Sequence, residues 1–155
     1  MDSPQNHIWG PHLWQILHSS AERIGSQTLK RLPQEETRIW NGLLSSLRFS
    51  LPCPQCKKHY TTYFTTRPIN TFSQSFFREW LFSLHQQVNE RTEKPNSLTI
   101  NQVHEIYSKP FCFSAHFSVV QEQMTRAIRL GWCSRDDVLK TIRFLQELKR
   151  FYDFF

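Results

Sequence analysis

The chain has 155 residues, which is enough for one compact domain with a buried core and too short for two ordinary domains. Hydrophobic residues make up 39% of the chain and charged residues 21%, a balance that excludes a disordered protein. The formal charge of +6 favours anionic partners, but the chain has no dense basic run, so we expect no nucleic-acid binding. No apolar run approaches the roughly 20 residues of a membrane-spanning helix, and we expect neither a membrane span nor a signal peptide.

Helical periodicity covers most of the chain, and together with only 4 Gly it predicts an all-α fold. Pro11 suits an early helical turn, and Gly25 is a natural end point for the first helix. Leu51 and Pro52 end the apolar stripe of the second helix. In chain order, the segments with helical periodicity are residues 8–24, 34–50, 54–66, 72–91, 99–108, 118–130 and 135–155.

Cys53 and Cys56 stand at the start of the third predicted helix. Pro54 suits the first helical position, so Cys53 is the expected cap. Two thiols at this spacing are close enough to form a disulfide, and the helix N-terminus favours a thiolate. We interpret the pair as redox-active, with the first cysteine open to exchange with a dithiol and the second one turn deeper. We expect the basic neighbours Lys57 and Lys58 to add modestly to thiolate stabilisation.

A CxxC pair also occurs in zinc sites and in the thioredoxin fold. Zinc would need two further ligands; His59 is close in sequence, but no second CxxC or HxxxH is present, so we expect no metal site. A thioredoxin fold would place the pair after a strand, whereas the segment before Cys53 has helical periodicity. The alternative function is a non-enzymatic helical module that binds zinc or an acidic partner through its cysteines and basic surface.

A dithiol that cycles needs an electron acceptor beside it. The 5 Trp residues, with several His on helix faces, could form a slot for a flat ring. The opposite interpretation is that these aromatic side chains are simply core, the usual fate of Trp at helical spacing. Periodicity leaves both interpretations open.

Residues 109–155 form a separate C-terminal extension with two amphipathic segments, divided at Gly131. An apolar stripe of this length is normally buried against another surface. We therefore expect the extension to pack on the preceding helices or to enlarge a dimer interface. It contains Cys112 and Cys133, which we expect to be buried thiols rather than a shuttle or structural pair.

Three sequence blocks follow one another through roughly two-thirds of the chain. The first block is Trp9-Gly10-Pro11 with Trp14 and Leu17-His18, the second is Leu51-Pro52-Cys53-Pro54-Gln55-Cys56 with His59, and the third is Trp80, His85, Val88-Asn89, Arg91 and Lys94. In this order the blocks resemble the FAD-dependent sulfhydryl oxidases of the Erv/ALR type, especially the small versions encoded by large DNA viruses.

The resemblance implies a four-helix bundle with a short fifth helix in residues 1–108, which would hold FAD against the cysteine pair and assemble as a homodimer. Cys56 would be the flavin-proximal thiolate and Cys53 the interchange cysteine that substrate thiols attack. The implied cofactor-binding residues are Trp9, Gly10, Trp14, His18 and His59, then Trp80, His85, Val88 and Asn89 around the adenine and ribose, and Arg91 and Lys94 near the phosphates.

The implied activity is that of a flavin-linked thiol oxidase. A substrate dithiol reduces the disulfide, the thiolate of Cys56 reduces flavin, and oxygen reoxidises flavin to give hydrogen peroxide. The implied partners are protein dithiols or a thioredoxin-like redox carrier, with oxygen as the electron acceptor. Because the resemblance is to viral members, we expect a cytoplasmic location in an infected host cell or an association with the virion.

The sequence departs from the family pattern at several positions. Gln86 stands where the family has Asn, and Thr92 stands where it has Leu, which affects the adenine side of the site. Phe82 and Thr99 occupy the positions of a structural disulfide found in many cellular members. No CxxC lies near the N-terminus, so an outside redox protein would have to deliver or receive disulfides.

Overall fold

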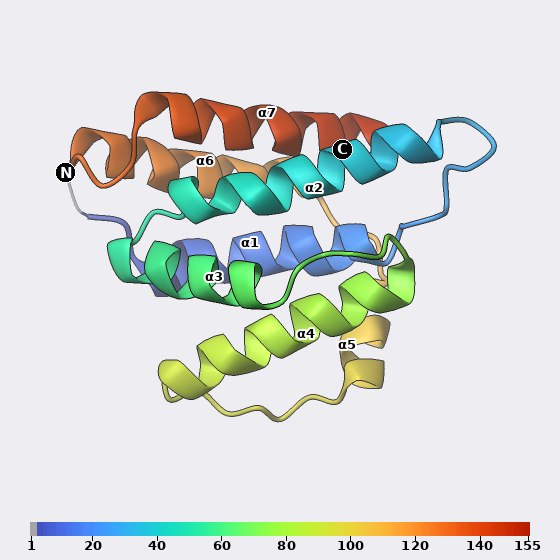
Figure 1. Ribbon diagram of the computed structural model, residues 1–155, viewed down its shortest axis with the longest axis horizontal. Helices are drawn as coiled ribbons and strands as arrows, with labels where there is room; N and C mark the ends of the chain where they lie inside the picture. Colours follow the sequence, from blue (N-terminus) through green and yellow to red (C-terminus); the bar gives the residue numbers. More distant parts are fainter. Residues whose placement is uncertain (1–2) are drawn as a thin grey trace.

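The computed structural model describes residues 3–155, and these residues form seven helices and no strand (Figure 1). The helices are α1 (Asn6–Ala21), α2 (Pro33–Ser50), α3 (Pro54–Thr66), α4 (Gln74–Arg91), α5 (Ile100–Tyr107), α6 (Phe113–Arg129) and α7 (Arg135–Phe151). The prediction of an all-α fold is confirmed. Among the helices described, none is both long and apolar enough to cross a membrane.

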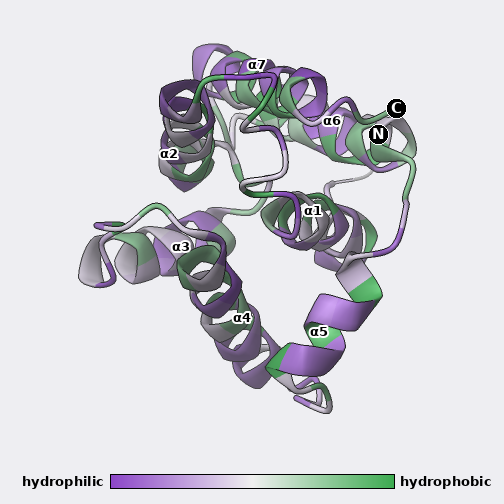
Figure 2. Ribbon diagram, turned by 90° about the vertical axis from the view of Figure 1, so that its right-hand side faces the viewer, coloured by the Kyte–Doolittle hydropathy of each residue, from purple (hydrophilic) through white to green (hydrophobic). Residues whose placement is uncertain are grey.

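Four of the helices, α1, α2, α6 and α7, pack together as one group. α2 packs along α7, α1 packs against α6, and α6 also contacts α7. α3 contacts α2, while α4 contacts both α1 and α5. Figure 2 views α1, α2, α6 and α7 nearly end-on and shows α4 and α5 on the opposite side of α1 from α6 and α7. α6 and α7 therefore lie on the side of α1 and α2 that is turned away from α4.

One apolar core connects the helices before and after residue 108. The apolar stripe predicted on α2 is buried in it, together with side chains from α4, α6 and α7. Its largest fully buried members include Trp40, Leu43, Leu44, Leu47, Phe77, Phe113, Met124, Leu145 and Leu148. Burial of one such side chain stabilises the fold by about 1.5–3 kcal/mol, so the contacts of α6 and α7 contribute strongly to stability.

The two largest differences from the predicted helix boundaries are at the start of α6 and the end of α7. α6 begins at Phe113 rather than at residue 118, because Phe113 is fully buried and the Ser114 N–H donates to the Phe155 carbonyl at 2.9 Å. The side chain of the α6 N-cap residue makes no capping hydrogen bond, so the sequence carries no capping signal there. α7 ends at Phe151 rather than running to the end of the chain, since Asp153 takes a left-handed backbone conformation with φ of 55°.

A buried polar group joins α2 to the end of α7. The Tyr152 hydroxyl donates to the Glu36 carboxylate at 2.5 Å and accepts from the Trp40 Nε1–H at 2.9 Å. Tyr152→Phe would leave the buried Trp40 N–H without an acceptor and the carboxylate short of a donor, so we expect the free energy of unfolding to fall by about 2–3 kcal/mol. Urea denaturation measures this loss. Tyr107→Phe is the matched control, because its hydroxyl makes no hydrogen bond in the described chain, and equal stability of the two variants would contradict the prediction.

Candidate active site

A cavity of about 490 Å³ lies between α1, α3, α4 and α5. Its wall contains residues from all three sequence blocks. The predicted site residues in this wall are Trp9, Gly10, Trp14, Cys53, Cys56, His59, His85, Val88, Asn89, Arg91 and Lys94. The fold therefore brings the cysteine pair and most of the predicted cofactor-binding residues to one place.

The cysteine pair lies at the start of α3. Cys53 is the N-cap residue, as predicted, and its Sγ accepts a hydrogen bond from the Cys56 backbone N–H at 3.2 Å. Pro54 follows at the first helical position, where an N–H would have no partner. The Cys53 N–H donates to the Leu51 carbonyl at 2.8 Å, which fixes the turn between α2 and α3. Both cysteines are half-buried free thiols.

Hydrogen bonding decides which of the two thiols ionises first. The Cys56 thiol is the main donor that lowers the pKa of Cys53 to about 6, and burial opposes this effect. The Cys56 backbone and the Asn6 side chain add further hydrogen bonds that lower the pKa of Cys53. The pKa of Cys56 is raised, first by its hydrogen bond to Cys53 and then by burial. Cys53 therefore carries the thiolate of the reduced pair at neutral pH, whereas the resemblance implied a thiolate at Cys56.

The lowered pKa of Cys53 predicts how its alkylation depends on pH. In the reduced protein, we expect the reaction of Cys53 with iodoacetamide to reach half its limiting rate near pH 6, because only the thiolate reacts. A free cysteine in a peptide, with a pKa of about 8.5, is the control. Peptide mass spectrometry over a pH series measures the rate at each cysteine. A half-maximal rate at Cys53 above pH 8 would contradict the prediction.

The basic neighbours of the pair do not act on Cys53 as expected. The Lys57 ammonium donates to the Trp132 carbonyl, in the turn between α6 and α7. Neither Lys57 nor Lys58 is among the groups that lower the pKa of Cys53. The pKa of Cys53 is lowered by hydrogen bonds from uncharged backbone and side-chain groups and not by the charges of the two lysines.

The two remaining cysteines lie at opposite ends of α6. Cys112 precedes α6 and is exposed, whereas Cys133 follows it and is buried, with its thiol donating to the Leu51 carbonyl at 3.4 Å. The 17 residues of α6 separate the two thiols by about 25 Å, so they do not form a pair. The expected burial is confirmed for Cys133 and is wrong for Cys112.

An aromatic stack borders the cavity. The Trp14 and His85 rings stack with their centroids 4.0 Å apart and an angle of 8° between their planes. His18 lies behind them, with its Nε2 at 3.0 Å from His85 Nδ1, and stacks on Tyr107. Burial is the main cause that lowers the pKa of His18 to about 3 and that of His85 to about 4. Both imidazoles are therefore neutral at pH 7, and the stack offers a flat, uncharged surface.

Two of the predicted cofactor-binding residues lie outside the cavity wall. His18 is buried behind the wall, where it contacts His85. Trp80 lies in the core between α3 and α4, where its Nε1–H donates to the Arg67 carbonyl at 2.9 Å and its ring packs edge-on against Tyr63. Each of these residues supports a neighbouring element and does not face the cavity.

The cavity wall also contains residues that the sequence did not single out. They include Asn6, Gln15, Leu47, Tyr60, Gln87 and Tyr107. Asn6 precedes Trp9 by three residues, which is one helical turn, and this spacing was the available signal for it. Tyr107 reaches the cavity from α5, and Arg23 holds that end of α5 by donating to the Tyr107 carbonyl at 2.8 Å.

Polar groups around the cavity indicate what it can bind. Trp9 Nε1 is buried, and it has no hydrogen-bond partner in residues 3–155. An unpaired buried donor costs about 1–3 kcal/mol, which a bound acceptor would relieve. Arg91 and Lys94 are exposed side chains of the same wall and supply positive charge. Together with the Trp14 and His85 rings, these groups suit a planar ligand that carries an anionic part.

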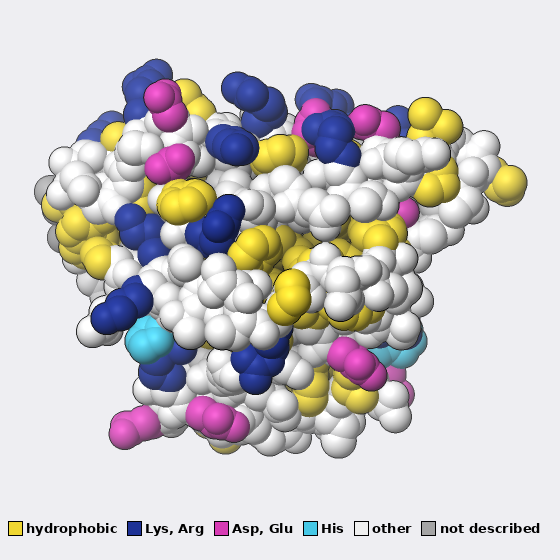
Figure 3. All heavy atoms as spheres, viewed as in Figure 1, with side chains coloured by type: hydrophobic (Ala, Val, Ile, Leu, Met, Phe, Trp, Pro, Cys, Tyr) yellow, Lys and Arg dark blue, Asp and Glu magenta, His cyan; other side chains and the backbone are white. Residues whose placement is uncertain are grey.

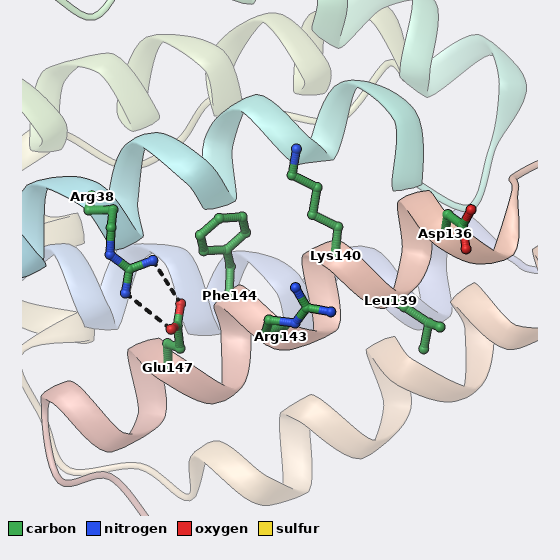
Figure 4. Close-up of a pocket in the computed structure, with 7 residues that line it drawn as sticks. All are labelled: Arg38, Asp136, Leu139, Lys140, Arg143, Phe144 and Glu147. Carbon is green, nitrogen blue, oxygen red and sulfur yellow. Dashed lines mark hydrogen bonds and ion pairs between the residues drawn. The ribbon is translucent and has the colours of Figure 1, made fainter.

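A second hollow, of about 580 Å³, lies between α2 and α7 and is lined by surface side chains (Figure 4). Within it the Arg38 guanidinium pairs with the Glu147 carboxylate at 3.1 Å. The Phe144 ring covers Gly42, where a Cβ would lie 2.2 Å from the ring, so Gly42 allows the close approach of α2 and α7. This hollow contains neither a cysteine nor a histidine and belongs to the packing of the two helices.

The structure gives little support to a metal site. Within the described residues, no group of three or more His, Cys, Asp or Glu side chains could hold a metal ion. On the face shown in Figure 3, Lys and Arg side chains are interspersed with Asp and Glu. The zinc alternative therefore lacks a ligand set in this part of the chain.

An all-α fold with a dithiol at the start of a helix, in the wall of an aromatic cavity, defines a class of helical dithiol proteins. A model of the Erv1/Alr family matches residues 11–108. The chain belongs to this family.

Similar proteins come from viruses and from a plant. A FAD-linked sulfhydryl oxidase of African swine fever virus (isolate Tick/Malawi/Lil 20-1/1983) is 34% identical over 86 residues, which cover 56% of this chain and 69% of the relative. The FAD-linked sulfhydryl oxidase ERV1 of Oryza sativa subsp. japonica is 27% identical over 56% of this chain and 42% of the relative. A putative FAD-linked sulfhydryl oxidase, 088R, of Frog virus 3 is 28% identical over 57% of this chain and 59% of the relative. No solved structure matches significantly.

Proposed function

We propose that the protein is an FAD-dependent sulfhydryl oxidase, which forms disulfide bonds in protein thiols and passes the electrons through flavin to oxygen, giving hydrogen peroxide. The observation that carries the proposal is the position of the cysteine pair, a dithiol in the wall of the cavity bordered by Trp14 and His85. The relatives described above are named FAD-linked sulfhydryl oxidases, which supports the same activity here.

The residues of the cavity fit FAD. A planar ring system matches the flat stack, an acceptor atom would pair the buried Trp9 Nε1–H, and a diphosphate matches the positive charge of Arg91 and Lys94. When bound, FAD supplies a two-electron acceptor that oxygen can reoxidise. The residues that would hold it are Trp9, Gly10, Trp14 and His59, with His85, Val88 and Asn89 around the adenine and ribose.

His18 and Trp80 act one step away from the cofactor in this proposal. His18 would fix the orientation and the proton of His85 through the contact between their ring nitrogens. Trp80 would hold α3 against α4 through its hydrogen bond to the Arg67 carbonyl. Both residues therefore serve as positioning residues.

Thiol exchange begins at Cys53. In the oxidised protein, a substrate thiolate attacks Cys53 Sγ, the Cys53–Cys56 bond breaks, and Cys56 leaves with the electron pair. A second substrate thiolate then attacks the substrate sulfur of the mixed disulfide and releases Cys53 as a thiolate. The low pKa of Cys53 makes it a good leaving group in this second step. Cys56 is the flavin-proximal cysteine in this scheme. Its hydrogen bond to Cys53 and its burial raise its pKa, and the Arg91 charge opposes this effect only in part.

The proposal extends to partners and location. The substrates are protein dithiols or a thioredoxin-like redox carrier, and oxygen is the final acceptor. We propose residues 1–108 as the FAD-binding unit and residues 109–155 as a helical extension. The homodimer, and the location in the cytoplasm of an infected host cell or in the virion, stay predictions that sedimentation and fractionation can test.

Oxygen consumption with a dithiol substrate tests the proposed function. The purified protein should consume one O₂ for each dithiol that it oxidises and produce one hydrogen peroxide, because each cycle moves two electrons. Dithiol oxidation without oxygen consumption would contradict oxygen as the acceptor. Stoichiometric zinc, with no flavin and no turnover, would favour the alternative of a zinc-binding module.

A further inference from the structure

Asn6 is the first residue of α1 and lies beside the cysteine pair. Its side chain lines the same cavity as both cysteines, and hydrogen bonding by Asn6 is among the causes that favour the thiolate form of each of them. It lies outside the three blocks that carry the family resemblance, since the first of these begins at Trp9. The position of Asn6 beside the cysteine pair is therefore a feature that the sequence blocks do not include.

Uncharged donors contribute most of the hydrogen bonding around the pair. The Cys56 N–H bonds to Cys53 Sγ, while the Lys57 ammonium is engaged at the Trp132 carbonyl. Two titratable groups from other segments interact electrostatically with the pair. Arg91 of α4 lowers the pKa of Cys56, and Cys133, in the turn between α6 and α7, interacts with Cys53. A thiolate has no proton and can only accept hydrogen bonds, so an amide that bonds to an ionised sulfur must donate from its NH₂ group.

The start of α1 is fixed from the C-terminal extension. The Gln5 backbone N–H donates to Gln123 Oε1 at 3.1 Å, and the Gln123 side chain is buried in α6. Gln5 is the N-cap of α1 and makes no side-chain capping bond itself. The contact from α6 therefore orders the residue directly before Asn6, and it ties the extension to the cysteine pair.

We propose that Asn6 is a catalytic residue of this protein, whose side-chain amide donates hydrogen bonds to the sulfurs of Cys53 and Cys56 and stabilises the thiolate formed when their disulfide is attacked. In that step, a substrate sulfur bonds to Cys53 Sγ, the Cys53–Cys56 bond breaks, and the electron pair stays on Cys56 Sγ. The place of Asn6 in the catalytic cycle rests on the proposed function, whereas its effect on the reduced pair does not.

Alkylation of the reduced protein tests this proposal. Full-length protein is reduced, treated with iodoacetamide under anaerobic conditions over a pH series, and analysed by peptide mass spectrometry that distinguishes Cys53 from Cys56. For Asn6→Ala we expect the Cys53 rate at pH 5 to fall about tenfold, with an unchanged limiting rate at high pH, because a lost hydrogen bond to a charged group raises the pKa of the thiol. Asn6→Asp has the same size but cannot donate from its carboxylate and repels a thiolate, so it should slow the reaction at least as much.

His7→Ala is the matched control, because His7 is the next residue of the same helical turn and is not part of the cavity wall. It should react like the unsubstituted protein. The proposal is overturned if the folded Asn6→Ala and Asn6→Asp variants both keep the unsubstituted pH profile, and Asn6→Asp alone decides if Asn6→Ala does not fold. Alkylation requires neither flavin nor oxygen, so this result is separate from success or failure of the oxidase assay.

Discussion

We expect Cys56→Ser to lower the turnover of dithiol oxidation by at least about a thousandfold while FAD stays bound. Without the second thiol, Cys53 can form a mixed disulfide with a substrate, but the Cys53–Cys56 disulfide cannot form. The electrons then have no route from the substrate to the flavin. Serine is close to cysteine in size, and the start of α3 keeps its Cys53 cap and Pro54, so the cavity wall should persist. Oxygen consumption and flavin absorbance of the same sample measure turnover and cofactor.

Cys112→Ser is the control for loss of a thiol as such. Cys112 is exposed and lies at the end of α6 away from Cys133, so its replacement should leave turnover unchanged. Turnover by Cys56→Ser at a rate near that of the unsubstituted protein would refute the proposed electron path. Loss of bound FAD in Cys56→Ser would show instead that the second cysteine is needed to form the site.

The second large effect is expected on removal of residues 109–155. α7 packs along α2 and α6 packs along α1, so the truncated chain would expose the apolar faces of both helices to water. Each large apolar side chain that loses its burial costs about 1.5–3 kcal/mol, and several such losses exceed the 5–15 kcal/mol by which a domain is normally stable. We expect residues 1–108 alone to be unfolded or aggregated, which circular dichroism and size-exclusion chromatography can measure.

Two leucines of α7 provide a matched comparison within the full chain. Leu145 is fully buried, and Leu145→Ala should lower the free energy of unfolding by about 2–5 kcal/mol. Leu139 is 45% exposed, and the same substitution there should cost much less. A folded, monomeric fragment 1–108 with an unchanged melting temperature would contradict the role given to the extension, as would equal losses at the two leucines.

Local sequence signals were sufficient to predict features that one helix determines by itself, such as where it begins and which of its faces is buried. Pro54 after Cys53 predicted the start of α3, because proline suits the first helical position and the side chain before it can cap the helix. The apolar stripe of α2 predicted the buried face that the structure shows, with Trp40 and Leu44 fully enclosed. Side-chain spacing within one helix determines both features.

Features that depend on distant contacts could not be predicted in this way. α6 begins at Phe113 because that side chain enters the core and because the Phe155 carbonyl accepts from the following residue. Trp80 faces the core rather than the cavity because its Nε1–H reaches the Arg67 carbonyl. Asn6 lies near the cysteine pair because α1 and the start of α3 border the same cavity. Each of these outcomes joins segments that one sequence window does not contain.

The visible absorption spectrum of the purified protein, followed through anaerobic addition of a dithiol and then admission of air, tests the central claim most directly. If the cysteine pair passes electrons to a flavin in the cavity, the sample has a flavin spectrum that bleaches with the dithiol and returns with oxygen. A colourless protein that takes up no added FAD would contradict the proposed function. A flavin spectrum that the dithiol leaves unchanged would contradict the electron path from Cys53 and Cys56.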